Sequence, residues 1–203
     1  MSRRILALIA VLALALAILT GLAVRKGVLG PGSQSAAVGG PFQLVDTSGR
    51  TVDQSVLKGK WSVVFFGFTH CPDICPTTLF ALAQVEPLLG PKGGDVQTVF
   101  ISVDPGRDTP KQMAAYVANP AFPKHLVGLT GSPAQVDGAA KAYRVYYQKQ
   151  GEGADYTVNH AAYSYLMTPK GRFACVLPYG QGPEKTAAKI QAAIAAGANA
   201  TSC

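Results

Sequence analysis

Two cysteines, Cys71 and Cys75, lie four positions apart, directly after a continuous hydrophobic run at residues 61–68. A tight turn or a single helical turn brings two sulfurs at this spacing to the same side, close enough for one metal ion or one disulfide. Pro76 suits the first position of a helix, and the positive end of such a helix favours thiolate. Because thiolate is both a metal ligand and a nucleophile, the pair predicts either metal binding or thiol–disulfide exchange.

A purely structural disulfide is the other interpretation of the Cys71/Cys75 pair. In the chain-entropy model, closing so short a loop stabilises a protein by only ~2 kcal/mol, against ~3 kcal/mol for a 15-residue loop. A chain of 203 residues is long enough to build a hydrophobic core of its own and does not depend on such a link. The pair is therefore expected to serve chemistry rather than stability.

A third group, His160, is expected to reach the same place. The runs at residues 61–68 and 97–103 predict buried strands, and ligands of open α/β sheets bind beyond the carboxyl ends of parallel strands. Cys71 follows the first of these strands and Asp104 follows the second. If the strand after residue 160 runs antiparallel, it starts at the same edge, and His160 stands at that start. Three distant stretches are thus predicted to converge.

Two thiolates and one imidazole form a soft set of three ligands. Soft sulfur ligands select Cu(I), zinc or iron–sulfur clusters, and a structural zinc site needs four ligands. Since Cys71, Cys75 and His160 are the three candidates that can be named, copper is the preferred metal. His70 is a candidate for a fourth ligand, but it adjoins Cys71 and is expected instead to be an exposed or hydrogen-bonded turn residue.

An alternation of strands and helices must position these groups. Hydrophobic patterns predict strands or extended segments at residues 42–46, 51–53, 61–68, 97–103, 126–129, 144–150, 162–167 and 172–177. Capping and proline signals predict helices at residues 76–89, 110–118, 133–143 and 183–196. Alternating elements that end in a hairpin and a helix predict an α/β sandwich with a mixed sheet.

Acidic residues in the turns of this scaffold have more than one use. Asp104 either lines the site or only forms the strand-to-helix turn. Asp73 either tunes the thiols or bonds the backbone of the cysteine turn. Asp108 and Thr109 are expected to cap the helix that follows them. The acidic side chains are therefore not included in the predicted ligand set.

Four further residues with potential ligand atoms lie outside the predicted site. His125 has no partner pattern and is expected at the surface. Met167 and Cys175 lie on apolar strands and are expected to pack in the core, where cysteine behaves as a small hydrophobe. Cys203 is the last residue and is expected to carry a free thiol. None of them is predicted to bind the metal.

The first 26 residues predict a membrane anchor. Residues 5–24 are apolar apart from Thr20 and Gly21, and a helix of this length is about 30 Å long, which matches the hydrocarbon core of a bilayer. A secretory signal has a shorter apolar region, so a retained single-pass helix is favoured over a cleaved signal. The charges of Arg3 and Arg4 favour an inside N-terminus. This predicts a bacterial inner-membrane protein whose soluble domain lies in the periplasm.

The chain is thereby divided into an anchor at residues 1–26, a flexible linker at 27–41 and one domain at 42–203. The linker is rich in Gly, Ser, Ala and Pro and reaches roughly 20 Å. Four basic residues flank the apolar run, and the other 14 basic and 11 acidic side chains leave a charge of only +3. No basic block with interleaved aromatic residues occurs, so nucleic-acid binding is not expected.

Five motifs in this chain resemble those of the Sco/SenC family, in the same order. They are G-F-T-H-C-P-D-I-C-P at 67–76, S-V-D-P-G-R-D-T-P at 102–110, L-T-G at 129–131, A-Y-R-V-Y-Y at 142–147 and V-N-H at 158–160. The resemblance covers about residues 40–195 together with the anchor. It implies a thioredoxin-like, membrane-tethered protein that binds copper through Cys71, Cys75 and His160.

The family is linked to assembly of the dinuclear copper centre of cytochrome c oxidase subunit II. The resemblance therefore implies a metallochaperone that holds Cu(I), with Cu(II) as a second state, takes it from a periplasmic copper donor, and passes it to that subunit. Asn159 departs from the family pattern, which usually has Asp before the histidine. The loss of one negative charge near the site is expected to weaken Cu(II) binding more than Cu(I) binding.

A thiol–disulfide oxidoreductase is the alternative function. One thiolate of the Cys71/Cys75 pair would attack a disulfide of the acceptor and the other would resolve the intermediate, with a thiol reductant as a further partner. A thioredoxin normally has C-x-x-C, so the C-x-x-x-C spacing and His160 favour metal. A peroxiredoxin-type peroxidase needs Thr three residues before its cysteine, where Phe68 and Pro72 stand. Copper binding and thiol–disulfide exchange can coexist in one protein, since oxidation of the Cys71/Cys75 pair abolishes copper binding.

Overall fold

The computed structural model describes residues 3–25 and 38–203 of the chain. It divides into two units, one that contains helix α1 (Arg3–Arg25) and one that begins at residue 38 and reaches the C-terminus. Most of the predicted linker at 27–41 lies outside the described residues. Among those that are described, no helix combines the length and the apolar character that crossing a bilayer requires. Helix α1 covers the predicted anchor at residues 5–24, and its insertion in a membrane stays a prediction.

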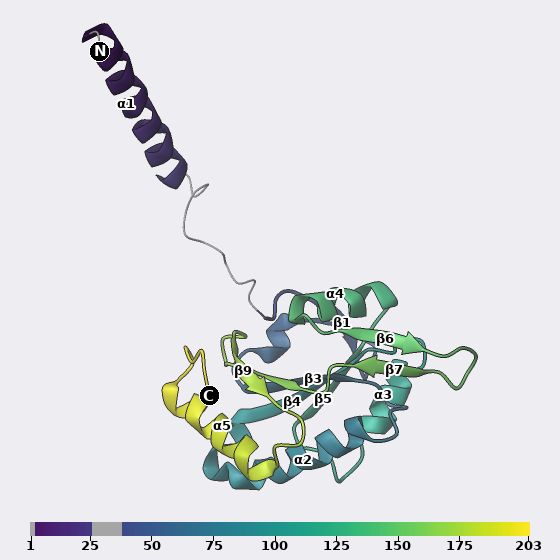
Figure 1. Ribbon diagram of the computed structural model, residues 1–203. Helices are drawn as coiled ribbons and strands as arrows, with labels where there is room; N and C mark the ends of the chain where they lie inside the picture. Colours follow the sequence, from purple (N-terminus) through teal and green to yellow (C-terminus); the bar gives the residue numbers. More distant parts are fainter. Residues whose placement is uncertain (1–2, 26–37) are drawn as a thin grey trace. The chain divides into compact units, whose positions relative to one another are not determined.

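The larger unit is built on a mixed sheet of seven strands (Figure 1). The strands are β1 (Gln43–Asp46), β2 (Thr51–Asp53), β3 (Trp61–Gly67), β4 (Val96–Ser102), β5 (Leu126–Thr130), β8 (Ser164–Met167) and β9 (Phe173–Leu177). Their order is β2-β1-β5-β4-β3-β8-β9, in which β3, β4 and β5 are parallel and β8 is antiparallel to β3. The predicted mixed sheet is confirmed, and so is the antiparallel direction of the strand that follows residue 160.

Strands β3 and β4 form the centre of the sheet, and every residue in both is buried. Their β-branched and aromatic side chains suit a strand that is covered on both faces. The two strands pair in parallel from Trp61 opposite Val96 to Gly67 opposite Ser102. Because their carboxyl ends are level, the loop that carries Cys71 and the loop that follows β4 leave the sheet side by side.

Helices cover both faces of the sheet. They are α2 (Ile74–Leu88), α3 (Pro110–Val117), α4 (Pro133–Tyr143) and α5 (Pro183–Ala196), with short 3-10 helices η1 (Gln54–Leu57) and η2 (Gly90–Asp95). Figure 1 shows α4 on one side of the sheet and α2 and α5 on the other. Successive residues of a strand point to opposite faces, so Phe66 of β3 meets Tyr143 of α4 while Val63 belongs to the cluster of Leu82 on α2.

The helix starts follow the predicted capping chemistry with one shift. Thr109 and Ser132 accept hydrogen bonds from the first turns of α3 and α4, as expected. Helix α2 begins at Ile74 rather than at Pro76, so Cys75 lies inside its first turn. A proline is tolerated there because the first N–H groups of a helix have no partner within it.

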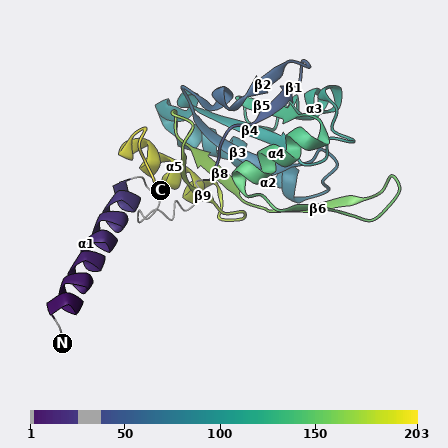
Figure 2. The same ribbon diagram turned by 90° about the horizontal axis from the view of Figure 1, so that it is seen from above.

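Strands β6 (Tyr147–Gln150) and β7 (Thr157–His160) pair with each other and form a two-stranded ribbon that is separate from the main sheet. Figure 2 shows this ribbon extending beyond the edge of the sheet. Strand β7 was not predicted, because its four residues follow a Gly-rich loop and are too few for a clear alternation. His160 is consequently the last residue of β7 and does not stand at the start of β8, which begins at Ser164.

The prediction that Cys203 is a free thiol, and that Cys175 only packs in the core, is wrong. The two residues form a disulfide between β9 and the C-terminal segment. The segment after α5 turns back along the sheet, where the Arg172 guanidinium donates to Asn199 Oδ1 at 2.6 Å and Ala200 is buried. This return of the chain brings Cys203 to β9, a contact between residues 28 positions apart.

Candidate metal centre

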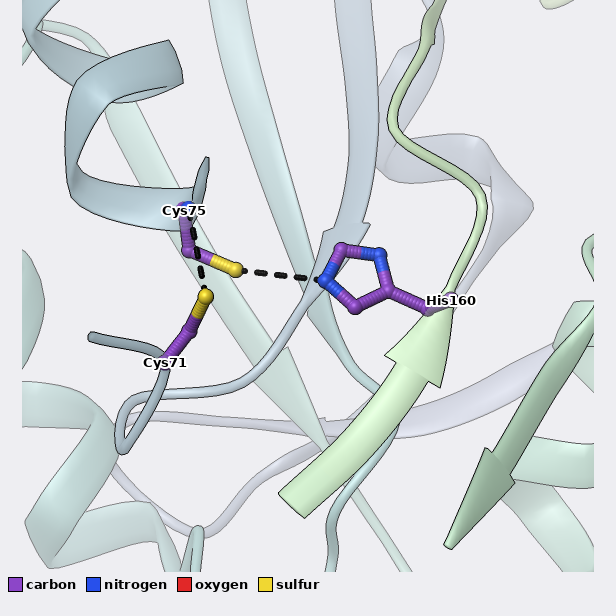
Figure 3. A group of neighbouring side chains, drawn as sticks. All are labelled: Cys71, Cys75 and His160. Atoms are coloured by element: carbon purple, nitrogen blue, oxygen red, sulfur yellow. Dashed lines mark hydrogen bonds between the residues drawn. The ribbon is translucent and has the colours of Figure 1, made fainter. Parts of the chain in front are cut away.

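Three side chains from distant parts of the chain meet at the carboxyl edge of β3 (Figure 3). The sulfurs of Cys71 and Cys75 and a ring nitrogen of His160 all lie within 4.8 Å of one another. The Cys75 Sγ is 3.5 Å from His160 Nε2, and the Cys75 backbone N–H donates to Cys71 Sγ at 3.4 Å. The structure therefore brings together the three residues that the sequence predicts as metal ligands.

Each of the three residues is held by a different element. Cys71 lies in the loop after β3, where its N–H donates to the Phe68 carbonyl at 3.2 Å. Cys75 is fully buried in the first turn of α2. His160 ends β7, and its Nδ1 is 3.0 Å from the Ala161 carbonyl. Since a carbonyl can only accept, Nδ1 donates to it, and Nε2 is the ring nitrogen that faces the sulfurs, as a metal ligand requires.

Aromatic rings support the imidazole, and a glycine makes room for the buried sulfur. The rings of Phe65 and Phe68 meet the His160 ring edge-on, with centroids 6.1 and 5.8 Å away. At Gly67, a Cβ atom would lie 2.6 Å from Cys75 Sγ, which is closer than real Cβ contacts come. A side chain at this position would displace Cys75, so the site depends on glycine where β3 ends.

The two thiols differ strongly in acidity. Hydrogen bonds, the largest from the Cys75 side chain and further ones from the His160 side chain and from backbone N–H groups, outweigh partial burial and lower the pKa of the Cys71 thiol to about 4. The bond to Cys71, followed by burial, raises the pKa of Cys75 far above its ordinary value. The pair thus shares one proton, which Cys75 keeps. Cys71 is a thiolate at neutral pH and is partly accessible to solvent.

The loop after β4 holds the cysteine loop through a buried carboxylate. Asp108 is fully buried and accepts hydrogen bonds from the Thr69 N–H at 3.1 Å, the Thr69 hydroxyl at 2.6 Å and the Ser102 hydroxyl at 2.6 Å. The expectation that Asp108 caps a helix is therefore wrong, although Thr109 does so. Charge-assisted hydrogen bonds of this kind are roughly twice as strong as neutral ones. They fix the backbone two residues before Cys71.

The other acidic candidates lie outside the metal group. Asp104 is buried but pairs with Arg107 and accepts the Tyr156 hydroxyl, so it forms no part of the cluster. The Asp73 carboxylate accepts the Thr77 hydroxyl of α2 at 3.1 Å and makes no cap hydrogen bond with the backbone, so neither use predicted for it is confirmed. Both carboxylates support the surrounding loops.

The remaining candidates also have structural roles. His70 is partly exposed, with Nδ1 3.1 Å from the Thr69 hydroxyl, and it remains a turn residue as expected. His125 is exposed and Met167 is fully buried in β8, and both expectations are confirmed. Asn159 is exposed and pairs with Gln148 across the ribbon, and it is not one of the three residues of the cluster.

Arg107 and Tyr156 are two residues near the site for which the sequence predicted no role. The Arg107 guanidinium carbon lies 3.6 Å from the centre of the Tyr156 ring. Arg107 stands in the loop at the predicted ligand edge, and Tyr156 lies four residues before His160. Those positions were a signal in the sequence, but the contact between them depends on the unpredicted strand β7.

A family model described as SCO1/SenC matches residues 30–195. The chain belongs to the SCO1/SenC family. It is 48% identical over 146 residues to "Protein SCO1 homolog 1, mitochondrial" of Arabidopsis thaliana, over 71% of this chain and 43% of that protein. It is 42% identical over 169 residues to "Protein SenC" of Rhodobacter capsulatus, over 83% of this chain and 74% of that protein. This SCO1/SenC chain thus spans less than half the length of its Arabidopsis relative.

Solved structures of family members share the fold. Bradyrhizobium japonicum ScoI with copper bound has a TM-score of 0.67 and 46% identity, over 75% of this chain and 96% of that chain. Arabidopsis thaliana ScoI with copper bound has a TM-score of 0.74 and 42% identity, over 79% and 99%. BsSco, with a TM-score of 0.57 and 28% identity over 73% and 88%, is described as having a disulfide switch and as a member of the Sco family of cytochrome c oxidase assembly proteins. These matches support the predicted thioredoxin-like arrangement of a mixed sheet flanked by helices.

Proposed function

We propose that this protein is a copper-binding assembly factor for cytochrome c oxidase. It holds Cu(I) on Cys71, Cys75 and His160 and passes the ion to an acceptor. The observation that carries the proposal is the cluster of two sulfurs and one imidazole nitrogen within 4.8 Å. A soft three-ligand set of this kind suits Cu(I). The copper-bound structures of two relatives support the same metal.

Transfer of the ion is a ligand exchange that begins on the exposed side of the cluster. Cys71 is partly accessible whereas Cys75 is fully buried, so an incoming acceptor thiolate approaches the ion past Cys71. With only three protein ligands, the ion can accept the new sulfur before an old one leaves. The protein thus holds copper as cargo, and the buried Cys75 is the last ligand to be released.

The acceptor is cytochrome c oxidase subunit II, in which a dinuclear copper centre is assembled, and the ion comes from a periplasmic donor.

The protein is attached to the bacterial inner membrane, and its domain lies in the periplasm. The apolar residues 5–24 between basic residues favour it. The Cys175–Cys203 disulfide favours an oxidising compartment. Protease treatment of cells with an opened outer membrane tests this: the domain should be digested, and protection there would contradict the placement.

Copper content and oxidase assembly test the function directly. The full chain and its His160→Ala, Cys71→Ser and Cys75→Ser variants are loaded with Cu(I) anaerobically, and copper per chain is measured. The parent should bind one ion, and each variant should lose it at the same competitor concentration. The same variants should fail to restore cytochrome c oxidase in cells that lack the protein. A parent that binds no copper, or variants that restore assembly fully, would refute the proposal.

Thiol–disulfide exchange is the second candidate, and the unequal acidity of the two thiols favours it. The Cys71 thiolate would attack a disulfide of the acceptor, and one acceptor sulfur would leave as thiolate. Cys75 would then lose its proton and displace the second acceptor sulfur. Two electrons pass to the acceptor, and a Cys71–Cys75 disulfide remains, which a separate thiol reductant must reduce.

Copper transfer and thiol–disulfide exchange predict different results for a variant that lacks His160. Exchange needs both cysteines and no imidazole ligand, so His160→Ala should retain reduction of a disulfide-containing acceptor peptide if exchange is the function. Oxidase assembly that survives in His160→Ala and fails in Cys75→Ser would favour the reductase. Assembly that fails in both variants, with peptide reduction intact in His160→Ala, would favour copper transfer.

A further inference from the structure

The imidazole of the metal group is carried by an element that the main sheet does not hold. Within the described domain, β6 and β7 pair only with each other, and His160 is the last residue of β7. The base of the ribbon is anchored by the buried side chain of Val158 and by the Ala161 N–H, which donates to the Tyr146 carbonyl at 3.1 Å. Most of the ribbon beyond this base is exposed. Contacts beyond this base also act on its direction relative to the thiols.

Arg107 makes such contacts from the loop after β4. Its Nη1 donates to the Tyr156 carbonyl at 2.9 Å, and its guanidinium carbon lies 3.6 Å from the centre of the Tyr156 ring. The Nε of Arg107 pairs with Asp104, whose carboxylate also accepts the Tyr156 hydroxyl. On the opposite strand, Lys149 Nζ lies 3.8 Å from the centre of the same ring. Tyr156 is thus held by its ring, its hydroxyl and its backbone.

The chemistry of this contact is specific to arginine. A planar guanidinium can stack on a ring while its separate nitrogens donate to a carboxylate and to a carbonyl, which the single ammonium of lysine cannot do. The third nitrogen, Arg107 Nη2, is buried and has no hydrogen-bond partner among the described residues. The guanidinium is therefore placed for its contacts with the ribbon and with Asp104, and one of its nitrogens is left without a partner.

The same loop also holds the thiol side of the site. Asp108, the next residue, fixes Thr69 two positions before Cys71 through two hydrogen bonds. The Arg107 guanidinium carbon is 5.8 Å from the centre of the Phe68 ring, and that ring meets His160 edge-on. Consecutive residues of one loop thus attach to the imidazole-bearing ribbon and to the thiol-bearing loop.

We propose that Arg107 is a positioning residue for the metal group, which fixes Tyr156 and thereby holds the His160 imidazole opposite Cys71 and Cys75. The inference rests on the proposed function, because it concerns how tightly the three ligands hold copper. Without the contact, the ribbon turns about its base and the imidazole leaves the sulfurs for part of the time. The ion is then held by two thiolates and is released more readily. Loss of a residue that orients a metal ligand typically weakens metal binding by roughly 10–100-fold.

Two variants remove the contact while they keep the fold. Arg107→Lys keeps the charge beside Asp104 but loses the planar stack and the forked donors. Tyr156→Leu keeps apolar bulk on the ribbon but loses the ring and the hydroxyl. Arg50→Lys is the matched control, because Arg50 pairs with Asp46 in the exposed turn between β1 and β2 and touches neither loop of the site.

The first measurement needs no metal. Hydrogen exchange of the apo protein should become at least several-fold faster in the ribbon amides of residues 148–158 in both variants, while the amides of β3 and β4 and the thermal midpoint stay close to the parent. The control should leave all of these unchanged. Ribbon exchange identical to the parent in both variants would overturn the proposal.

The second measurement follows the ion itself. Competition with a Cu(I) chelator should show a roughly 10–100-fold weaker affinity in both variants and a parental affinity in the control. The nitrogen hyperfine signal of the Cu(II) form should weaken toward that of His160→Ala. Parental affinity and signal would overturn the proposal even if the ribbon moved. If the parent itself binds no copper, the proposed function fails. Hydrogen exchange of the apo protein still decides whether Arg107 holds the ribbon.

Discussion

The four cysteines form two pairs whose surroundings differ. Cys71 and Cys75 are four residues apart, remain free thiols, and lie beside the His160 imidazole at the edge of the sheet. Cys175 and Cys203 are 28 residues apart and form a disulfide that ties the C-terminal segment to β9, within the hydrophobic cluster of α5. The first pair has backbone N–H groups and an imidazole around it, whereas the second packs against an apolar cluster and has one long contact, from Lys189 Nζ to Cys203 Sγ at 3.9 Å.

This difference shows that cysteine chemistry is decided by the neighbours of the sulfur. Donated hydrogen bonds lower the pKa of Cys71 to about 4, which maintains a thiolate for a metal or for an attack. A disulfide between distant residues instead restricts the unfolded chain. The first pair is therefore suited to reactivity and the second to stability, and each can be altered without the other.

The largest expected effect is the difference in Cu(I) affinity between two single variants, one from each cysteine pair. Cys75→Ser removes a ligand of the proposed metal group, so Cu(I) affinity should fall by more than the roughly 10–100-fold that loss of an outer-shell partner costs. Cys175→Ser removes no ligand and should leave the affinity within about twofold of the parent. Competition with a Cu(I) chelator under reducing conditions measures both. Equal losses in the two variants would mean that the pairs are not separate in function.

Removal of the disulfide should affect stability and spare the site. For a loop of 28 residues the chain-entropy model gives about 3.5 kcal/mol, on the order of a few hundredfold in the unfolding equilibrium. Denaturant unfolding of the Cys175→Ser/Cys203→Ser double variant in its apo form measures this loss. Hydrogen exchange around Cys71 should remain as in the parent. A loss below about 1 kcal/mol would contradict a stabilising role for the second pair.

The pH dependence of alkylation sharpens the comparison further. An ordinary thiol has a pKa near 8.5, so its reaction with iodoacetamide becomes nearly a hundredfold faster between pH 6 and pH 8. Because the pKa of Cys71 is lowered to about 4, its thiolate persists through this range, and the rate should be nearly constant and decline only below about pH 5. Mass spectrometry of the apo protein identifies the labelled residue. The protein unfolded in urea is the control and should regain the ordinary steep dependence.

The smallest effect is expected from Asn159→Asp. Asn159 is exposed on the ribbon beside His160, so an added carboxylate acts on the ion through solvent and should shift affinity by only several-fold. Cu(II), with the larger charge, should gain more than Cu(I). Parallel titrations of the two oxidation states give the ratio of their affinities. An unchanged ratio would count against an electrostatic role for this position.

Much of the scaffold and the ligand candidates followed from the sequence. Hydrophobic runs, proline positions and capping residues are local signals, and they placed the central strands β3 and β4 and the starts of α3 and α4 near their observed positions. The spacing of Cys71 and Cys75 is equally local. The rule that the carboxyl ends of parallel strands share one edge also placed His160 at this edge, although the residue ends β7 instead of starting β8.

Only the tertiary structure decided the contacts between residues far apart in the chain. The ribbon that carries His160, the bond from Thr69 to Asp108 across 39 residues and that from Arg107 to Tyr156 across 49 all depend on how loops meet after the sheet has formed. The disulfide between Cys175 and Cys203 likewise depends on the return of the chain after α5. Residue type and spacing limit which side chains can do chemistry, whereas distances and shared protons arise when separate segments pack together.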